Sequence, residues 1–129
     1  MERVILDTGV LVAAVRGQAS VPDDADISIP AICVAEFLAG VHLDADVSHQ
    51  AAQRAFLDEV LTVVPVIDYD RSIAEHHAGL LAHTARAGAA RGAHDLIIAA
   101  TARATDRVLI TTDARAHFEE LPGVVARIV

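Results

Sequence analysis

The sequence has 129 residues, of which 53% are hydrophobic and 3% aromatic. This length suits one domain over residues 1–129, with a core built from Val, Ile, Leu and Ala rather than from aromatic rings. The formal net charge of −8 argues against sequence-independent binding to nucleic acid through a basic surface. It leaves open an enzyme that acts on nucleic acid, because bound divalent cations reverse the charge of a local acidic site.

All ten basic residues are arginines, and the absence of lysine excludes several classes of enzyme. A P-loop site needs a lysine on the phosphates of its nucleotide, and receiver domains and aspartyl-phosphate phosphatases also carry a site lysine. Cys33 is the only cysteine, so no disulfide framework is expected. No apolar run reaches the ~18–20 residues that span a bilayer, and the run after Met1 is too short for a signal peptide. We therefore expect a cytoplasmic protein with no membrane partner.

The first third of the chain alternates apolar runs with loops. In chain order it predicts a strand at Val4–Leu6, a buried helix from Val10 to Val15 that ends near Gly17, an acidic loop over 18–26, a short strand at Ile27–Ile29, and a helix over 30–41. Proline at the start of that last helix fits, because its missing N–H would have no partner there.

The rest of the chain continues the alternation. In chain order it predicts a loop over 43–48, a helix over 48–62 capped by Ser48, an edge strand at Val63–Ile67 that contains Pro65, a helix capped by Asp70 that runs to Ala87, a linker over 88–92, a helix at Ala93–Thr105, a strand at Val108–Thr111, a short helix at Ala114–Glu120, and a last strand at Val124–Val129. This order predicts an α/β fold with a short, mostly parallel sheet of four or five strands and helices on both faces.

Two aspartates follow predicted strands at one edge of this sheet. Parallel α/β sheets bind ligands outside the carboxyl ends of their strands. Asp7 and Asp113 both lie at that edge. Each also has a structural explanation, because an aspartate there can cap the helix that follows.

Two further acids lie on apolar faces of predicted helices. The neighbours of Glu36 one turn away are apolar or small, and Asp95 shares its face with Ile98 and Ala99. A buried carboxylate is costly unless it is paired, hydrogen-bonded or bound to a metal. A partly exposed helix edge for Glu36 and a favourable first-turn position for Asp95 are the structural alternatives. Four carboxylates that converge would repel one another unless cations bridge them, and an all-oxygen site selects Mg²⁺ or Mn²⁺.

These four acids resemble the acidic motifs of PIN-domain ribonucleases, and among those of VapC-type toxins from bacterial toxin–antitoxin pairs. The motifs are "ILDTGVLVA" around Asp7, "PAICVAEFLAG" around Glu36, "GAHDLIIAATA" around Asp95 and "LITTDARAHFEELPGV" around Asp113. Their order and spacing fit over essentially the whole chain. The resemblance implies a PIN-like three-layer fold. It also implies that these acids are the catalytic and metal-binding carboxylates.

The resemblance further implies Mg²⁺- or Mn²⁺-dependent cleavage of RNA, often tRNA or ribosomal RNA, in the bacterial cytoplasm. It implies a homodimer and a cognate antitoxin that covers the acidic cleft. Thr8 and Thr111 fall where the family has supporting hydroxyls. The sequence departs from the family's pattern in two places: Gly9 replaces the commoner serine, and Asp113 stands where many members have asparagine.

The flanking residues suggest further contacts with RNA. Arg91 and Arg115 flank two of the acidic motifs and are candidates for phosphate binding, against the alternative of solvated surface arginines. His94, beside Asp95, has either a structural role or a contact with substrate. In the proposed mechanism, Asp7, Glu36 and Asp95 hold one ion, and Asp7 and Asp113 complete a second position.

Two alternatives to the nuclease remain. "LDTG" is also the signature of a dimeric aspartic protease, but that fold is almost wholly β, whereas this chain has long helical periodicities. The other alternative is a PIN-like module that binds or assembles without catalysis. Against it, an inactive module has no physical reason to keep four mutually repelling acids.

Overall fold

The computed structural model describes residues 1–19 and 23–129 and contains a five-stranded sheet with the order β3-β2-β1-β4-β5. The strands are β1 (Arg3–Leu6), β2 (Asp26–Pro30), β3 (Val66–Ile67), β4 (Val108–Thr111) and β5 (Ala126–Ile128). Every neighbouring pair is parallel. The predicted parallel α/β sheet is confirmed, with β3 at an edge as Pro65 indicated.

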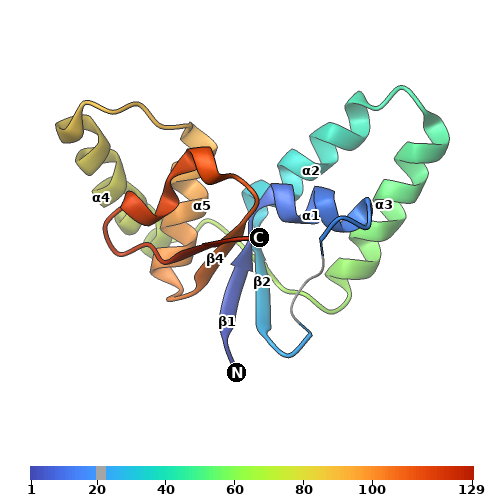
Figure 1. Ribbon diagram of the computed structural model, residues 1–129, viewed down its shortest axis with the longest axis horizontal. Helices are drawn as coiled ribbons and strands as arrows, with labels where there is room; N and C mark the ends of the chain where they lie inside the picture. The colour runs from blue at the N-terminus through green and yellow to red at the C-terminus, as the bar shows by residue number, and fades with distance from the viewer. Residues whose placement is uncertain (20–22) are drawn as a thin grey trace.

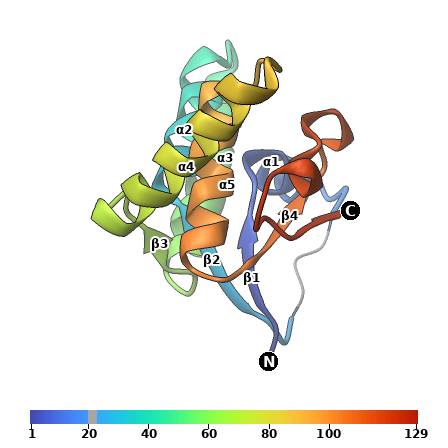
Figure 2. The same ribbon diagram turned by 90° about the vertical axis from the view of Figure 1, so that its left-hand side faces the viewer.

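Helices cover both faces of this sheet. They are α1 (Thr8–Val15), α2 (Ala31–Leu43), α3 (Val47–Leu61), α4 (Arg71–Ala87) and α5 (Ala93–Ala104). In Figure 1, α4 and α5 lie to the left of the strands and α1 and α3 to the right, which makes three layers. Figure 2 shows α4 and α5 running side by side in front of the sheet. Among the described residues, no helix is both long and apolar enough to cross a membrane.

The core is aliphatic, as the composition predicts. Central strands of a parallel sheet are buried on both faces, so they read as continuous apolar runs. Val4, Ile5 and Leu6 of β1 are all buried, as are Leu109 and Ile110 of β4. β1 runs upward from the N-terminus at the bottom of Figure 1, so the carboxyl ends of the strands lie at the top, between the two groups of helices.

The prediction that Ser48 caps the third helix is wrong. Asp46 caps it, because its Oδ1 accepts hydrogen bonds from the backbone N–H groups of Ser48 and His49 at 2.8 and 3.1 Å. The helix therefore begins at Val47, and the connection before it is shorter than the predicted loop over 43–48. The cap predicted at Asp70 is confirmed, with Oδ1 accepting from the N–H of Ile73 at 2.9 Å.

Boundaries elsewhere also differ from the prediction: α1 begins at Thr8, β2 spans Asp26–Pro30, and α2 spans Ala31–Leu43. Three later segments differ as well. Val64 donates its N–H to the carbonyl of Val60 at 2.9 Å, which continues the turn of α3, so the edge strand starts only at Val66. The predicted helix over 114–120 is two 3-10 turns, η1 (Ala114–Ala116) and η2 (Phe118–Glu120). His117 separates them because its φ of 49° is not helical. The last strand is shorter than predicted. Residues 20–22 of the predicted acidic loop lie outside the described residues.

Arg107 ties the amino ends of β1 and β2 together, on the side of the sheet away from the aspartates. Its Nη1 donates to the carbonyls of Val4 and Asp26 at 3.1 and 2.8 Å, and its side chain is only 10% exposed.

Replacing Arg107 by alanine is expected to lower the free energy of unfolding by about 2 kcal/mol, because these carbonyls lose a charged donor. Urea denaturation measures the change. Arg54→Ala, which removes an exposed helical ion pair, is the control, and equal losses for the two variants would contradict this role.

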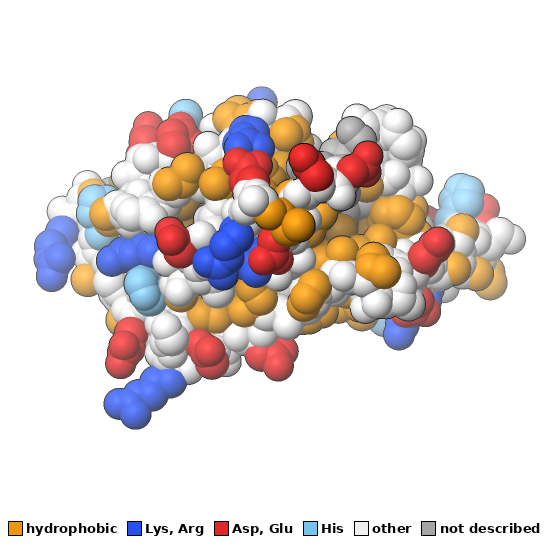
Figure 3. All heavy atoms as spheres, turned by 90° about the horizontal axis from the view of Figure 1, so that it is seen from below, with side chains coloured by type: hydrophobic (Ala, Val, Ile, Leu, Met, Phe, Trp, Pro, Cys, Tyr) orange, Lys and Arg blue, Asp and Glu red, His pale blue; other side chains and the backbone are white. Residues whose placement is uncertain are grey.

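The side of the molecule opposite the aspartates carries a mixed surface. Figure 3 views the molecule from below, and acidic and basic side chains are interspersed over this face. The ion pairs near the amino ends of β1 and β2 include Arg3 with Asp26 and Arg127 with Glu2. Among the described residues, this face therefore shows no extended area of one charge that would attract a polyanion.

Candidate active site

Asp7 lies at the carboxyl end of β1 and caps α1. Its side chain is held from two sides: Oδ1 accepts a hydrogen bond from the N–H of Thr8 at 2.7 Å, and Oδ2 accepts one from the hydroxyl of Thr111 at 2.8 Å. The residue is only 8% exposed. The two bonds fix the direction of the carboxylate where β1 and β4 end side by side.

Glu36 points from α2 toward this strand edge. Its Oε1 accepts a hydrogen bond from the hydroxyl of Thr8 at 2.8 Å, and its Oε2 lies 3.2 Å from Nδ1 of His94. Its side chain is 31% exposed, which matches the partly exposed helix edge that was its structural alternative, although both of its carboxylate oxygens have partners. Thr8 therefore joins the first two acidic motifs, and His94 joins the second to the third.

Asp113 is tied to the same strand edge through Thr111. The Thr111 hydroxyl that donates to Asp7 also accepts from the N–H of Asp113 at 3.0 Å. Oδ1 of Asp113 caps η1 by accepting from the N–H groups of Arg115 and Ala116 at 3.0 and 3.2 Å. The structural role of Asp113 as a cap is therefore real, and it leaves Oδ2 available for another partner.

Asp95 lies in the first turn of α5, over the backbone of Gly92. A Cβ on Gly92 would lie 3.0 Å from Oδ2 of Asp95, closer than side chains normally approach. Glycine at position 92 therefore leaves room for this carboxylate at the start of the helix. The glycine that begins the third acidic motif has a steric reason in this fold.

Hydrogen bonds join the segments that carry the four acids at one edge of the sheet, and the acids affect one another's ionisation there. Burial raises the pKa of Asp7, and the negative charges of Glu36 and Asp113 raise it further against the opposing effect of its hydrogen bonds. Burial likewise raises the pKa of Asp95, followed by the charges of Asp7, Asp113 and Glu36. Within residues 1–19 and 23–129, no arginine lies at ion-pair distance from any of the four carboxylates. Their mutual repulsion is therefore uncompensated by arginine.

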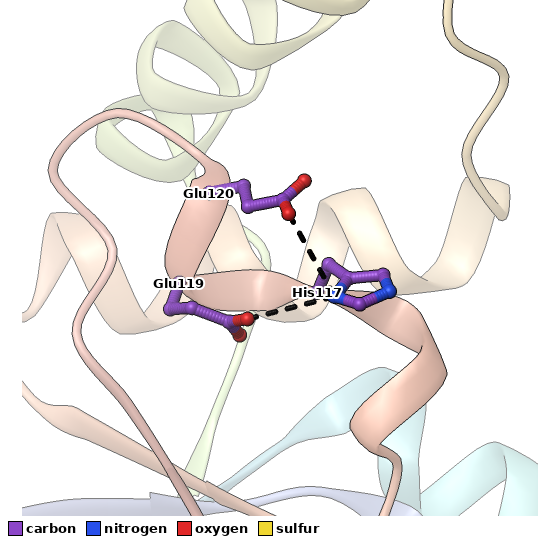
Figure 4. A group of neighbouring side chains, drawn as sticks. All are labelled: His117, Glu119 and Glu120. Atoms are coloured by element: carbon purple, nitrogen blue, oxygen red, sulfur yellow. Dashed lines mark ion pairs between the residues drawn. The ribbon is translucent and has the colours of Figure 1, made fainter.

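This arrangement fits a hard divalent cation. The donor set is all oxygen, which suits Mg²⁺ or Mn²⁺ rather than zinc. Asp95 lines a hollow at the surface, and a cation bound there would relieve the repulsion between the carboxylates. No three of the four acids bring their oxygens within 4.8 Å of one another. Across the described parts of the chain, three donors meet that spacing only at His117, Glu119 and Glu120, an exposed group on the η1–η2 turn (Figure 4).

The two arginines that flank the acidic motifs differ in their surroundings. Arg91 donates through Nη1 to the carbonyls of Ala116 and His117, and its Nη2 lies 3.4 Å from Oε2 of Glu120. Its side chain is 16% exposed, so it ties the segment before α5 to the η1–η2 turn. Arg115 is exposed, and its guanidinium has no hydrogen-bond partner among the described residues. Both line a hollow of about 300 Å³ that also contains Asp95.

Gly9 and Cys33 complete the surroundings of Asp7. A Cβ on Gly9 would overlap the hydroxyl of Thr112, so the fourth motif packs against the first at this glycine. Cys33 is fully buried beneath the site, and burial raises the pKa of its thiol to about 12. A thiol in this environment is not a nucleophile. The parallel sheet and its helices contradict the aspartic-protease alternative.

The sequence analysis named the four acids, both threonines and His94, but it did not predict that Thr8 and His94 contact Glu36. The bond from Thr8 to Glu36 spans 28 residues and that from His94 spans 58. Nothing in a local motif encodes such pairings. A histidine directly before the third acidic residue was the available signal.

Comparisons with known proteins identify the family and the fold. The PIN domain family model matches residues 4–124. The structure is similar to that of VapBC2 from Rickettsia felis, with a TM-score of 0.85, 22% identity and 99% of each chain covered. The Rickettsia felis protein is bound there to a DNA fragment from its promoter. It is also similar to VapBC-5 from Mycobacterium tuberculosis, with a TM-score of 0.81, 25% identity and 100% of each chain covered.

DNA-bound VapBC from Salmonella typhimurium gives a TM-score of 0.83 at 23% identity, with 99% of this chain and 98% of that chain covered. No curated protein sequence gives a significant match. The family model spans nearly the whole chain, from β1 through the segment before β5, and includes all four acidic motifs. The chain belongs to the PIN domain family.

Proposed function

We propose that the protein is a Mg²⁺- or Mn²⁺-dependent endoribonuclease and the toxin of a type II toxin–antitoxin pair. The observation that carries this proposal is the convergence of four acids, unpaired with arginine, at the carboxyl edge of a PIN-domain sheet. Membership of the PIN domain family supports a nuclease, and the VapBC neighbours support a toxin. The proposed substrate is RNA, either tRNA or ribosomal RNA.

Asp7, Glu36 and Asp95 would hold one ion, with Asp7 and Asp113 contributing to a second position. A divalent cation bound there supplies an activated water and charge neutralisation at the phosphodiester. Thr111 orients Asp7 through a 2.8 Å hydrogen bond. Thr8 does the same for Glu36 at 2.8 Å, so the carboxylates keep their directions without a ligand.

The two arginines have different proposed roles toward RNA. Arg115 is exposed on the rim of the hollow that contains Asp95, so it is the better placed of the two to bind a phosphate of the substrate. The guanidinium of Arg91 is already engaged by two carbonyls and Glu120. Arg91 would therefore act on RNA mainly by fixing the turn that carries Arg115.

The partners are proposed from the relatives. VapBC structures from several bacteria resemble this chain over its full length, which supports a cognate antitoxin that covers the acidic cleft. We further propose that the protein forms a homodimer and acts in the bacterial cytoplasm. The alternative of a non-catalytic binding module makes a different prediction about RNA, so one experiment separates the two.

Incubation of a total RNA pool with purified, antitoxin-free protein tests the function. In Mg²⁺ or Mn²⁺ we expect discrete fragments, and in EDTA we expect intact RNA, because the acids alone neither activate water nor neutralise phosphate. Gel analysis and sequencing of the fragment ends measure the result and identify the cleaved bond. Intact RNA with every metal, from protein whose circular dichroism shows the helical fold, would favour the binding module.

A further inference from the structure

Glu36 is held at both of its carboxylate oxygens by side chains from other helices. Thr8 of α1 donates its hydroxyl proton to Oε1 at 2.8 Å, and Nδ1 of His94, from α5, lies 3.2 Å from Oε2. These two residues are the direct chain neighbours of Asp7 and Asp95. Glu36 therefore lies between the first and third acidic positions and is bonded to Thr8, next to Asp7, and to His94, next to Asp95.

The chemistry of the pair assigns the direction of the second bond. A carboxylate only accepts, so Nδ1 of His94 carries the proton and donates it to Oε2. The neutral tautomer with a proton on Nδ1 and the imidazolium both make this bond. The contact therefore does not depend on the charge of the histidine.

Stability does not account for this bridge. The side chains of His94 and Glu36 are 56% and 31% exposed. Partly exposed pairs of this kind contribute little to the free energy of folding. What the bridge does fix is the direction of Glu36 relative to Asp95, because His94 and Asp95 share the first turn of α5.

We infer that His94 is a positioning residue that holds Glu36 in the direction required to bind the metal ion together with Asp7 and Asp95. The inference rests on the proposed metal-dependent function. Side chains that orient metal ligands through hydrogen bonds typically contribute 10- to 100-fold to metal affinity or activity. Thr8 holds the other oxygen, so the loss of His94 alone belongs at the lower end of that range.

The test is Mn²⁺ binding to the full-length protein, measured from the signal of free Mn²⁺ in electron paramagnetic resonance. His94→Ala is expected to weaken binding by about 10-fold. His94→Asn is expected to restore most of it, because an amide N–H replaces Nδ1–H at the same distance from the backbone. His83→Ala, at an exposed histidine on α4, is the matched control and should bind as the wild type does.

Thermal unfolding of the metal-free variants separates positioning from folding, since His94→Ala should unfold within about 2 °C of the wild type. Wild-type affinity in His94→Ala, or binding by His94→Asn as weak as that by His94→Ala, would overturn the inference. Failure of the wild type to bind Mn²⁺, or equal binding by Glu36→Gln, would instead overturn the proposed metal site, and this inference with it.

Discussion

Replacing Asp7 by asparagine is expected to lower RNA cleavage about a thousand-fold or more, equivalent to about 4 kcal/mol of transition-state stabilisation, and to leave the protein folded. Asp7 is the most buried of the four acids and would contribute to both proposed metal positions. An amide at this position keeps one oxygen for hydrogen bonding but loses the negative charge that attracts a cation. Initial rates on an RNA fragment that contains the cleaved bond measure the loss.

The matched control for this substitution is Asp58→Asn. Asp58 is an exposed aspartate on α3, so this substitution makes the same chemical change away from the site. In the described parts of the chain, its only ion pair is with Arg54. Its cleavage rate should equal that of the wild type. Comparable rates for Asp7→Asn and wild type would show that Asp7 acts only as a helix cap. An unfolded Asp7→Asn would move the test to Asp113→Asn, at an exposed position, for which a large loss is also expected.

The positions of Asp7 and Asp113 could be predicted because two local rules place them. A short apolar run predicts a buried strand, and parallel strands end at one edge of their sheet. The structure joins the two through one hydroxyl, since Thr111 donates to Asp7 and accepts from the N–H of Asp113. A side chain that follows a buried strand has few directions open to it, so its position in the sequence is enough to predict that it lies at this edge of the sheet.

Helix boundaries were less predictable because several polar residues compete for each cap. Asp46 and Ser48 are both good N-cap residues. Asp46 is the cap because one of its oxygens accepts from two backbone N–H groups, a geometry that depends on the turn before the helix.

The segment after β4 forms two 3-10 turns instead of the predicted helix, and tertiary contacts accompany the break between them. The carbonyls on either side of the η1–η2 break, of Ala116 and His117, both accept from Arg91, a residue 25 positions earlier in the chain than Ala116.

The role of Arg91 illustrates what local sequence cannot supply. Beside an acidic motif, an arginine suggests a phosphate ligand, but here its guanidinium faces inward onto carbonyl oxygens. Arg115 has the same kind of flanking position and remains exposed. The difference between them is set by tertiary packing of the η1–η2 turn against the start of α5, which no spacing rule describes.

Binding of Mn²⁺ is expected to raise the free energy of unfolding by about 2.7 kcal/mol when the free ion is at 100 times its dissociation constant. The effect should grow with pH. The pKa values of Asp7 and Asp95 are raised in the folded protein, so between the ordinary value of 3.8 and the raised values the folded state holds more protons than the unfolded state. The metal-free protein therefore loses stability as pH rises through this window, because the acids must ionise beside one another.

Mn²⁺ reverses that trend because it binds the ionised oxygens and competes with protons for them. Urea denaturation across a pH series, with and without Mn²⁺, measures both slopes. In Asp95→Asn the metal-free loss of stability with rising pH should be smaller, since one of these two carboxyl groups with a raised pKa is gone and the repulsion on Asp7 is lower. If metal-free stability instead rose with pH through the same window, the folded protein would already neutralise these carboxylates, and the physical reason for a cation at this edge of the sheet would disappear.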